Sequence, residues 1–108
     1  LRTNNTSVAY DAFLSIQNQT EEGTYAHTLA SFYLGQIALS KEEYAKAEIL
    51  FKAVQANSGL PIESDNQYYL ALSLIGQEKY EPARSHLASI SSNYYNYDKV
   101  EQLLNILK

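Results

Sequence analysis

Two stretches of the chain, YLGQIALSKEEYAKAEILF at residues 33–51 and YLALSLIGQEKYEPARSHL at residues 69–87, repeat one pattern at a spacing of 36 residues. The matched positions keep their size class, and they are Tyr33 with Tyr69, Leu34 with Leu70, Gly35 with Ala71, Tyr44 with Tyr80, Ala47 with Ala83, and Phe51 with Leu87. A period of this length is typical of a two-helix unit stacked on copies of itself. The repeat therefore predicts an all-α fold, and it favours a protein that holds another molecule on its surface.

Apolar spacing and helix-stop residues divide the chain into about six expected helices, at residues 6–18, 25–39, 42–57, 64–75, 79–91 and 98–108. Thr24 is expected to cap the second helix, and Ser40 with Glu43 to form a capping box at the start of the third. Gly59 is expected to end the third helix in a left-handed cap, and Pro82 to lie in the first turn of the fifth. Because every expected turn is short, neighbouring helices should form antiparallel hairpins.

The repeated residues resemble the tetratricopeptide repeat, whose pattern is W-x2-L-G-x2-Y, then A-x3-F, then P. One unit, residues 28–61, carries Leu-Gly at 34–35 and the Ala47–Phe51 pair. The next, residues 64–97, carries Leu-Ala at 70–71 and the Ala83–Leu87 pair. The tryptophan position of the family holds a polar residue in both units, and the proline of the first unit comes two residues late.

This resemblance implies one domain, residues 1–108, in which antiparallel hairpins stack as a right-handed superhelix. Residues 6–18 would be the second half of a preceding repeat, and residues 98–108 a capping helix. The leucine-rich end of the chain also resembles the C-terminal repeat domains of bacterial envelope-associated proteins, which implies a place on either the cytoplasmic or the periplasmic side of the envelope.

In the resembled family, the first helix of each unit lines a concave groove that binds other proteins. By motif position, the residues that would line the groove here are Leu29, Phe32, Tyr33, Gln36, Tyr68, Tyr69 and Leu72. Residues 25–40 contain no Lys, Arg, Asp or Glu. A neutral aromatic groove has the composition of a protein-binding surface. For Tyr33 and Tyr68 an ordinary core position, with the ring inside and the hydroxyl at the edge, fits the pattern equally well.

Composition argues against several other functions. The net charge of −4 and the dispersed cations among 8 Lys and Arg residues disfavour nucleic-acid binding. The absence of cysteine excludes thiolate chemistry, and neither His27 nor His86 has a second metal ligand at suitable spacing. No phosphate-binding loop, nucleophile motif or bilayer-length apolar segment occurs. We therefore expect no enzymatic activity, no cofactor, no metal and no membrane insertion by this segment.

The sequence thus predicts a module that binds a protein or peptide, and it does not identify that partner. A structural alternative is a self-association domain that oligomerises a larger protein, since an open helical array exposes apolar faces at its ends. A third alternative is an enzyme with an unrecognised site.

Overall fold

The computed structural model describes residues 2–57 and 61–108. Within these residues the chain forms helices and no strand, and the helices are α1 (Arg2–Gln19), α2 (Tyr25–Ser40), α3 (Tyr44–Gln55), α4 (Glu63–Gly76), α5 (Tyr80–Ala88) and α6 (Tyr97–Ile106). The predicted all-α fold is therefore confirmed.

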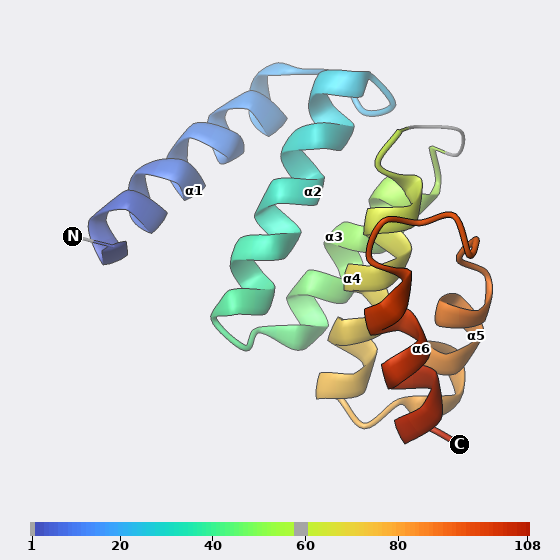
Figure 1. Ribbon diagram of the computed structural model, residues 1–108. Coiled ribbons are helices and arrows are strands. Elements are labelled where there is room, and N and C mark those ends of the chain that lie inside the picture. The colour runs from blue at the N-terminus through green and yellow to red at the C-terminus, as the bar shows by residue number, and fades with distance from the viewer. Residues whose placement is uncertain (1, 58–60) are drawn as a thin grey trace.

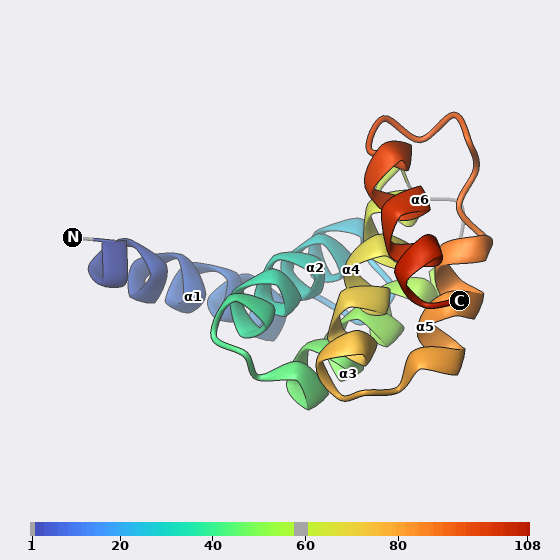
Figure 2. The same ribbon diagram turned by 60° about the horizontal axis from the view of Figure 1, so that its bottom comes forward.

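Each helix from α1 to α5 packs chiefly against its neighbours in sequence, α6 makes fewer contacts with α5, and α2 also contacts α4 (Figure 1). Figure 2 shows α2, α4 and α6 on one side of the stack and α3 and α5 on the other. The result is an elongated array of hairpins, 41 × 31 × 23 Å, with α1 at one end and α6 at the other. Contacts between elements close in sequence dominate, as expected for a repeat array.

The 36-residue period is repeated in the backbone of two turns. The turn between α2 and α3 holds Glu42 at φ 60°, and the turn between α4 and α5 holds Glu78 at φ 61°. In each turn the N–H of the following residue donates to the carbonyl oxygen five residues earlier, at 2.9 Å. This is the bonding of a Schellman cap, in which a left-handed residue ends the helix. The two hairpins are thus closed in the same way.

The core contains the small and large residues that the repeat pairs. Ala47, Phe51, Ala83 and Leu87 are all fully buried. Alanine at these crossings lets two helices approach closely, and the larger side chain one turn later fills the space that remains. These positions therefore hold the hairpins together, as their spacing predicts.

The helix starts are predicted less well than the helices. Thr24 does cap α2, because its Oγ1 accepts the N–H of His27 at 3.2 Å, and Pro82 does lie in the first turn of α5. The capping box is wrong. Ser40 is the last residue of α2, where its hydroxyl donates to the carbonyl oxygen of Ile37, and Glu43 makes no side-chain cap. The Schellman turn occupies the three residues between Ser40 and α3, so α3 begins later than expected.

Two further boundaries differ from the expectation by three residues or more. Helix α5 ends at Ala88, three residues early, so residues 89–96 form a longer loop before α6. Helix α1 begins at Arg2, four residues early. The expected cap at Gly59 lies outside the described residues.

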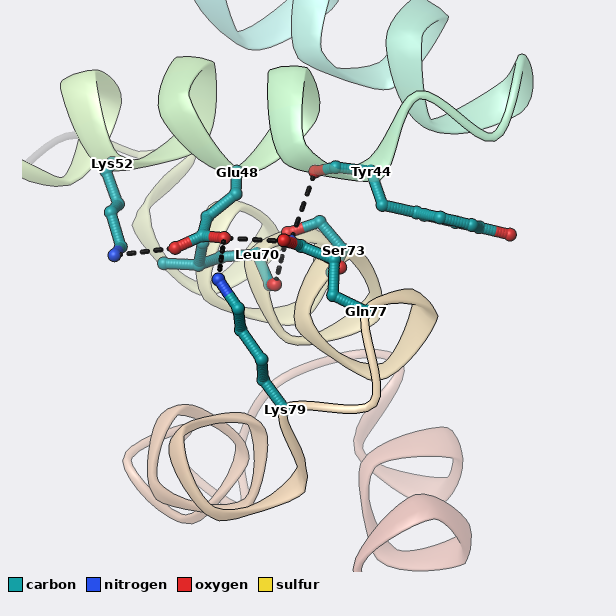
Figure 3. Close-up of polar contacts among 7 residues, drawn as sticks. All are labelled: Tyr44, Glu48, Lys52, Leu70, Ser73, Gln77 and Lys79. Atoms are coloured by element: carbon teal, nitrogen blue, oxygen red, sulfur yellow. Dashed lines mark hydrogen bonds and ion pairs between the residues drawn. The ribbon is translucent and has the colours of Figure 1, made fainter.

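One polar cluster joins the first hairpin to the second (Figure 3). The carboxylate of Glu48 on α3 accepts hydrogen bonds from Nζ of Lys52 at 2.7 Å, from Nε2 of Gln77 at 2.8 Å and from Nζ of Lys79 at 3.2 Å. The bond from Lys52, with those from Gln77 and Lys79, lowers the pKa of the Glu48 carboxyl to about 2 against the opposing effect of burial. Two cations and an amide thus hold this carboxylate ionised and fix α3 to the end of α4.

Candidate protein-binding surface

The residues predicted to line a groove come from two helices that touch. Leu29, Phe32, Tyr33 and Gln36 lie on α2, while Tyr68, Tyr69 and Leu72 lie on α4, and α2 packs against α4. The fold therefore brings the two sets together on adjacent first helices of the hairpins. All except Phe32 are at least partly accessible to solvent.

Phe32 is a correction to the predicted set. Only 4% of its surface is exposed, and its ring packs edge-on against Phe51 in the core, with 6.2 Å between centroids. The neighbouring Tyr33 is instead 38% exposed. Successive residues on a helix point about 100° apart, so when one ring enters the core the next can face outward. Phe32 therefore supports the surface from beneath and is not part of it.

Seven aromatic rings follow one another across the molecule, each within 6.4 Å of the next between centroids, and they are, in order, Phe13, Tyr33, Phe32, Tyr69, Tyr68, Tyr94 and Tyr95. We call this series the aromatic row. Its members come from α1, α2, α4 and the loop at residues 89–96. Such separations suit stacked and edge-to-face ring contacts, which hold each ring in a fixed orientation. The row is therefore a preordered series of rings that is anchored in the core and open to solvent in places.

Three members of the row were missed by the sequence analysis of the groove. Phe13 of α1 stacks on Tyr33 at 4.9 Å with only 20° between the ring planes. Tyr94 and Tyr95 fold back from the loop, and Tyr94 lies 6.4 Å from Tyr68. The available signal was the density of tyrosine at residues 94–97, where three large rings occur within four residues.

A carboxylate fixes the loop end of the row. Asp65 in the first turn of α4 accepts hydrogen bonds from the hydroxyls of both Tyr94 and Tyr95, the latter at 2.8 Å. Burial, and then the bond to Asp65, raises the pKa of Tyr94, while for Tyr95 the bond to Asp65 is the main cause of a raised pKa. Burial also raises the pKa of Tyr68. These phenols therefore stay protonated near neutral pH, and their rings add no charge to the surface.

A shallow groove of about 330 Å³ runs between α1 and α2 beside Tyr33. Its lining consists of Thr6, Ala9, Phe13, Tyr33, Gln36, Ile37 and Ser40, none of which is charged. Two predicted residues, Tyr33 and Gln36, therefore line a real depression, and Tyr33 connects it to the aromatic row. This combination of one exposed ring, an apolar floor and a few neutral polar groups suits the contact zone of a protein interface.

The two histidines lie apart from each other, on α2 and α5. Residues 2–57 and 61–108 contain no cluster of three or more His, Asp or Glu side chains that could hold a metal ion. The ring of His27 contacts the carbonyl oxygen of Gln17 at 3.0 Å, and that of His86 contacts the amide oxygen of Gln67 at 2.7 Å. Burial lowers the pKa of His86. Both histidines thus bridge neighbouring helices through neutral partners.

No protein-family model, curated protein or solved structure gives a significant match to this chain. Among the described helices, none has the length and apolar character needed to cross a bilayer.

Proposed function

We propose that the chain is a non-enzymatic module of tetratricopeptide type, and that it binds a peptide or protein segment along the aromatic row and the groove between α1 and α2. The observation that carries this proposal is the continuity of the row, which links α1, α2, α4 and the loop through ring-to-ring contacts. The stack of hairpins and the repeated Schellman turns support the family assignment.

The physical argument rests on preorganisation. Tyrosine offers a large ring and a hydroxyl with few rotatable bonds, and it is enriched among the residues that dominate binding energy. Here each ring is already held by its neighbours, so little conformational entropy is lost when a partner docks. A partner would gain ring contacts at Tyr33 and Tyr95, the most exposed members of the row, and hydrogen bonds to phenol edges between them.

The uncharged lining of the groove between α1 and α2 favours partners of a particular chemistry. Because the groove contains no charged side chain, a strongly charged segment would lose hydration without gaining a counterion. An apolar or aromatic segment with backbone carbonyls free to accept bonds from tyrosine and glutamine suits this surface best. The net charge of −4 further disfavours nucleic acid.

A peptide-display selection tests this function directly. Random peptides are selected on the wild-type chain, and the dissociation constants of the enriched sequences are then measured by titration calorimetry. We expect the Tyr33→Ser/Tyr95→Ser variant to bind them at least about tenfold more weakly, since each exposed anchor ring typically contributes about 2 kcal/mol. Tyr80→Ser, an exposed tyrosine on α5 outside the row, is the matched control. Equal affinity of the double variant and the control would refute the proposal.

A further inference from the structure

Part of the hydrogen-bonding capacity along the aromatic row is unused within the chain. Among the residues that the structure describes, the hydroxyls of Tyr33, Tyr68 and Tyr69 make no hydrogen bond. The same holds for the amide of Gln36, which lines the groove together with Tyr33. All four side chains are at least partly accessible to solvent. Because phenols and amides can each donate a hydrogen bond, the surface presents free donors set among ring faces.

These donors suit a segment whose backbone accepts hydrogen bonds and donates few. A polyproline II helix has no internal hydrogen bonds, so its carbonyl oxygens remain free. Proline also lacks an N–H, so a proline-rich segment can cover the rings without burying unpaired donors. An ordinary extended segment would instead bring an N–H at every residue toward ring faces, which accept hydrogen bonds poorly. The surface therefore favours proline over other residues in the partner.

The arrangement of the rings suits the same conformation. Proline-rich segments in the polyproline II conformation dock on grooves lined with aromatic side chains. Tyr33 and Tyr95 are 38% and 74% exposed, and Tyr68 and Tyr69, which lie between them in the row, are partly buried. Ring-to-ring contacts already hold these tyrosines in place. A stiff segment would thus meet a stiff surface, and the loss of conformational entropy on binding is small.

The loop end of the row is negatively charged. The carboxylate of Asp65 lies there and accepts hydrogen bonds from the hydroxyls of Tyr94 and Tyr95. Asp98 in the first turn of α6 adds a second carboxylate nearby, since its charge contributes, after burial and the adjacent tyrosine, to the raised pKa of Tyr68. Within the described part of the chain, neither carboxylate forms an ion pair. A cation on the partner is therefore best placed at the loop end.

We propose that the partner is a proline-rich segment in the polyproline II conformation, with a lysine or arginine at the end that lies over Asp65. This inference rests on the proposed function, because it names the partner of the same surface. The prolines contact the exposed rings, and their carbonyl oxygens accept hydrogen bonds from the free phenols and from Gln36. The cation pairs with the carboxylates at the loop end, outside the uncharged groove between α1 and α2.

Two synthetic peptides with blocked ends test the backbone preference. The first has nine prolines with an arginine at each end, and the second has alanine at every second proline. In titration calorimetry the first should bind at least about tenfold more tightly, because alanine restores both flexibility and N–H groups. Tyr68→Phe/Tyr69→Phe keeps the rings, removes two donors and should weaken the first peptide about fivefold. Equal affinity of the two peptides overturns the inference.

A charge-removing variant tests where the cation lies. Asp65→Asn keeps an oxygen that can accept from Tyr94 and Tyr95 but removes the negative charge. It should weaken the arginine-bearing peptide about threefold and leave the affinity for nine uncharged prolines unchanged. Glu43→Gln removes an exposed charge in the turn after the other end of α2, and it is the matched control that should bind both peptides as the wild type does. Equal effects of the two variants overturn the placement of the cation.

The peptides selected by display separate this inference from the proposed function. If their binding depends on Tyr33 and Tyr95 but their sequences show no excess of proline, the function stands and the inference is overturned. If Tyr33→Ser/Tyr95→Ser binds both the selected peptides and the proline peptide as tightly as the wild type does, the surface is wrong and both proposals fail. An excess of proline together with dependence on both rings supports both.

Discussion

The ring of Phe51 lies directly on the backbone of Gly35, so closely that a Cβ atom at that glycine would stand 2.6 Å from the ring. These two residues come from the two helices of the first hairpin, and Phe51 is completely buried. A second such contact joins the hairpins to each other, because a Cβ atom on Gly76 would lie 2.4 Å from the ring of Tyr44. Both glycines serve close approach and neither has a left-handed backbone.

We predict that Gly35→Ala destabilises the chain more than Gly76→Ala. Phe51 has no room to move, so the new methyl group at residue 35 should cost about 1–3 kcal/mol of overpacking, partly offset by the better helix propensity of alanine. The Tyr44 ring is only half-buried, so its whole side chain can swing toward solvent, and Gly76→Ala should cost less than Gly35→Ala although the contact there is as tight. Urea unfolding midpoints measure the difference. A larger loss at Gly76 would mean that the Tyr44 ring is held as rigidly as Phe51.

We predict that Glu78→Gly stabilises the chain. Glu78 ends α4 with φ 61°, a conformation that costs a residue with a Cβ atom about 1 kcal/mol and costs glycine almost nothing. Relief of this strain should outweigh the greater freedom of glycine in the unfolded chain and raise the unfolding free energy by about 0.5–1 kcal/mol. Thermal melts provide the measurement. The control is Glu101→Gly, inside α6, which should instead lose about 1 kcal/mol.

The left-handed residues Glu42 and Glu78 also explain why two helix starts could not be predicted from the local sequence. The spacing of alanines, glycines and large apolar residues was enough to predict the helices, because burial on one face leaves a periodic trace. The starts of α3 and α5 depend on Glu42 and Glu78, and glutamate carries no preference for the left-handed region, so no residue type indicated where the turns close.

The candidate surface was predicted only in part, because some of its features also depend on contacts that the local sequence does not encode. The motif positions predicted that Tyr33, Tyr68 and Tyr69 lie on adjacent first helices. Whether Phe32 or Tyr33 is the buried ring depends on the rotation of α2 against its neighbours, which the motif does not specify. Tyr94 and Tyr95 join the row through contacts with α4 residues about 30 positions earlier. Such non-local pairing leaves no periodic signal within the loop itself.

Acid sensitivity should depend on Glu48. Its pKa in the folded chain is about 2, below the ordinary value of 4.5, so its contribution to stability is fully present above pH 4.5 and is lost as the pH falls from there toward 2. Glu48→Gln should therefore flatten the dependence of the unfolding free energy on pH in this window and cost about 1–2 kcal/mol at neutral pH. Chemical denaturation at a series of pH values measures both effects.

A second substitution isolates the cause of that shift. Lys52→Gln removes the strongest donor to the Glu48 carboxylate, so the pKa of Glu48 should rise and the acid transition should begin at higher pH. Carboxyl chemical shifts followed by NMR report the pKa directly. An unchanged titration of Glu48 in this variant would mean that Gln77 and Lys79 alone hold the carboxylate ionised.

The last prediction separates the exposed rings of the aromatic row from the core beneath them. Tyr33→Ser/Tyr95→Ser removes two exposed rings and should cost less stability than Phe51→Ala, which opens a cavity in the core worth about 3–5 kcal/mol. The double variant should keep its helical content by circular dichroism while losing the affinity for selected peptides. Urea unfolding of both variants makes the comparison. If the double variant unfolds as readily as Phe51→Ala, the two tyrosines act chiefly as packing residues, and the surface proposed for partner binding loses its most exposed anchors.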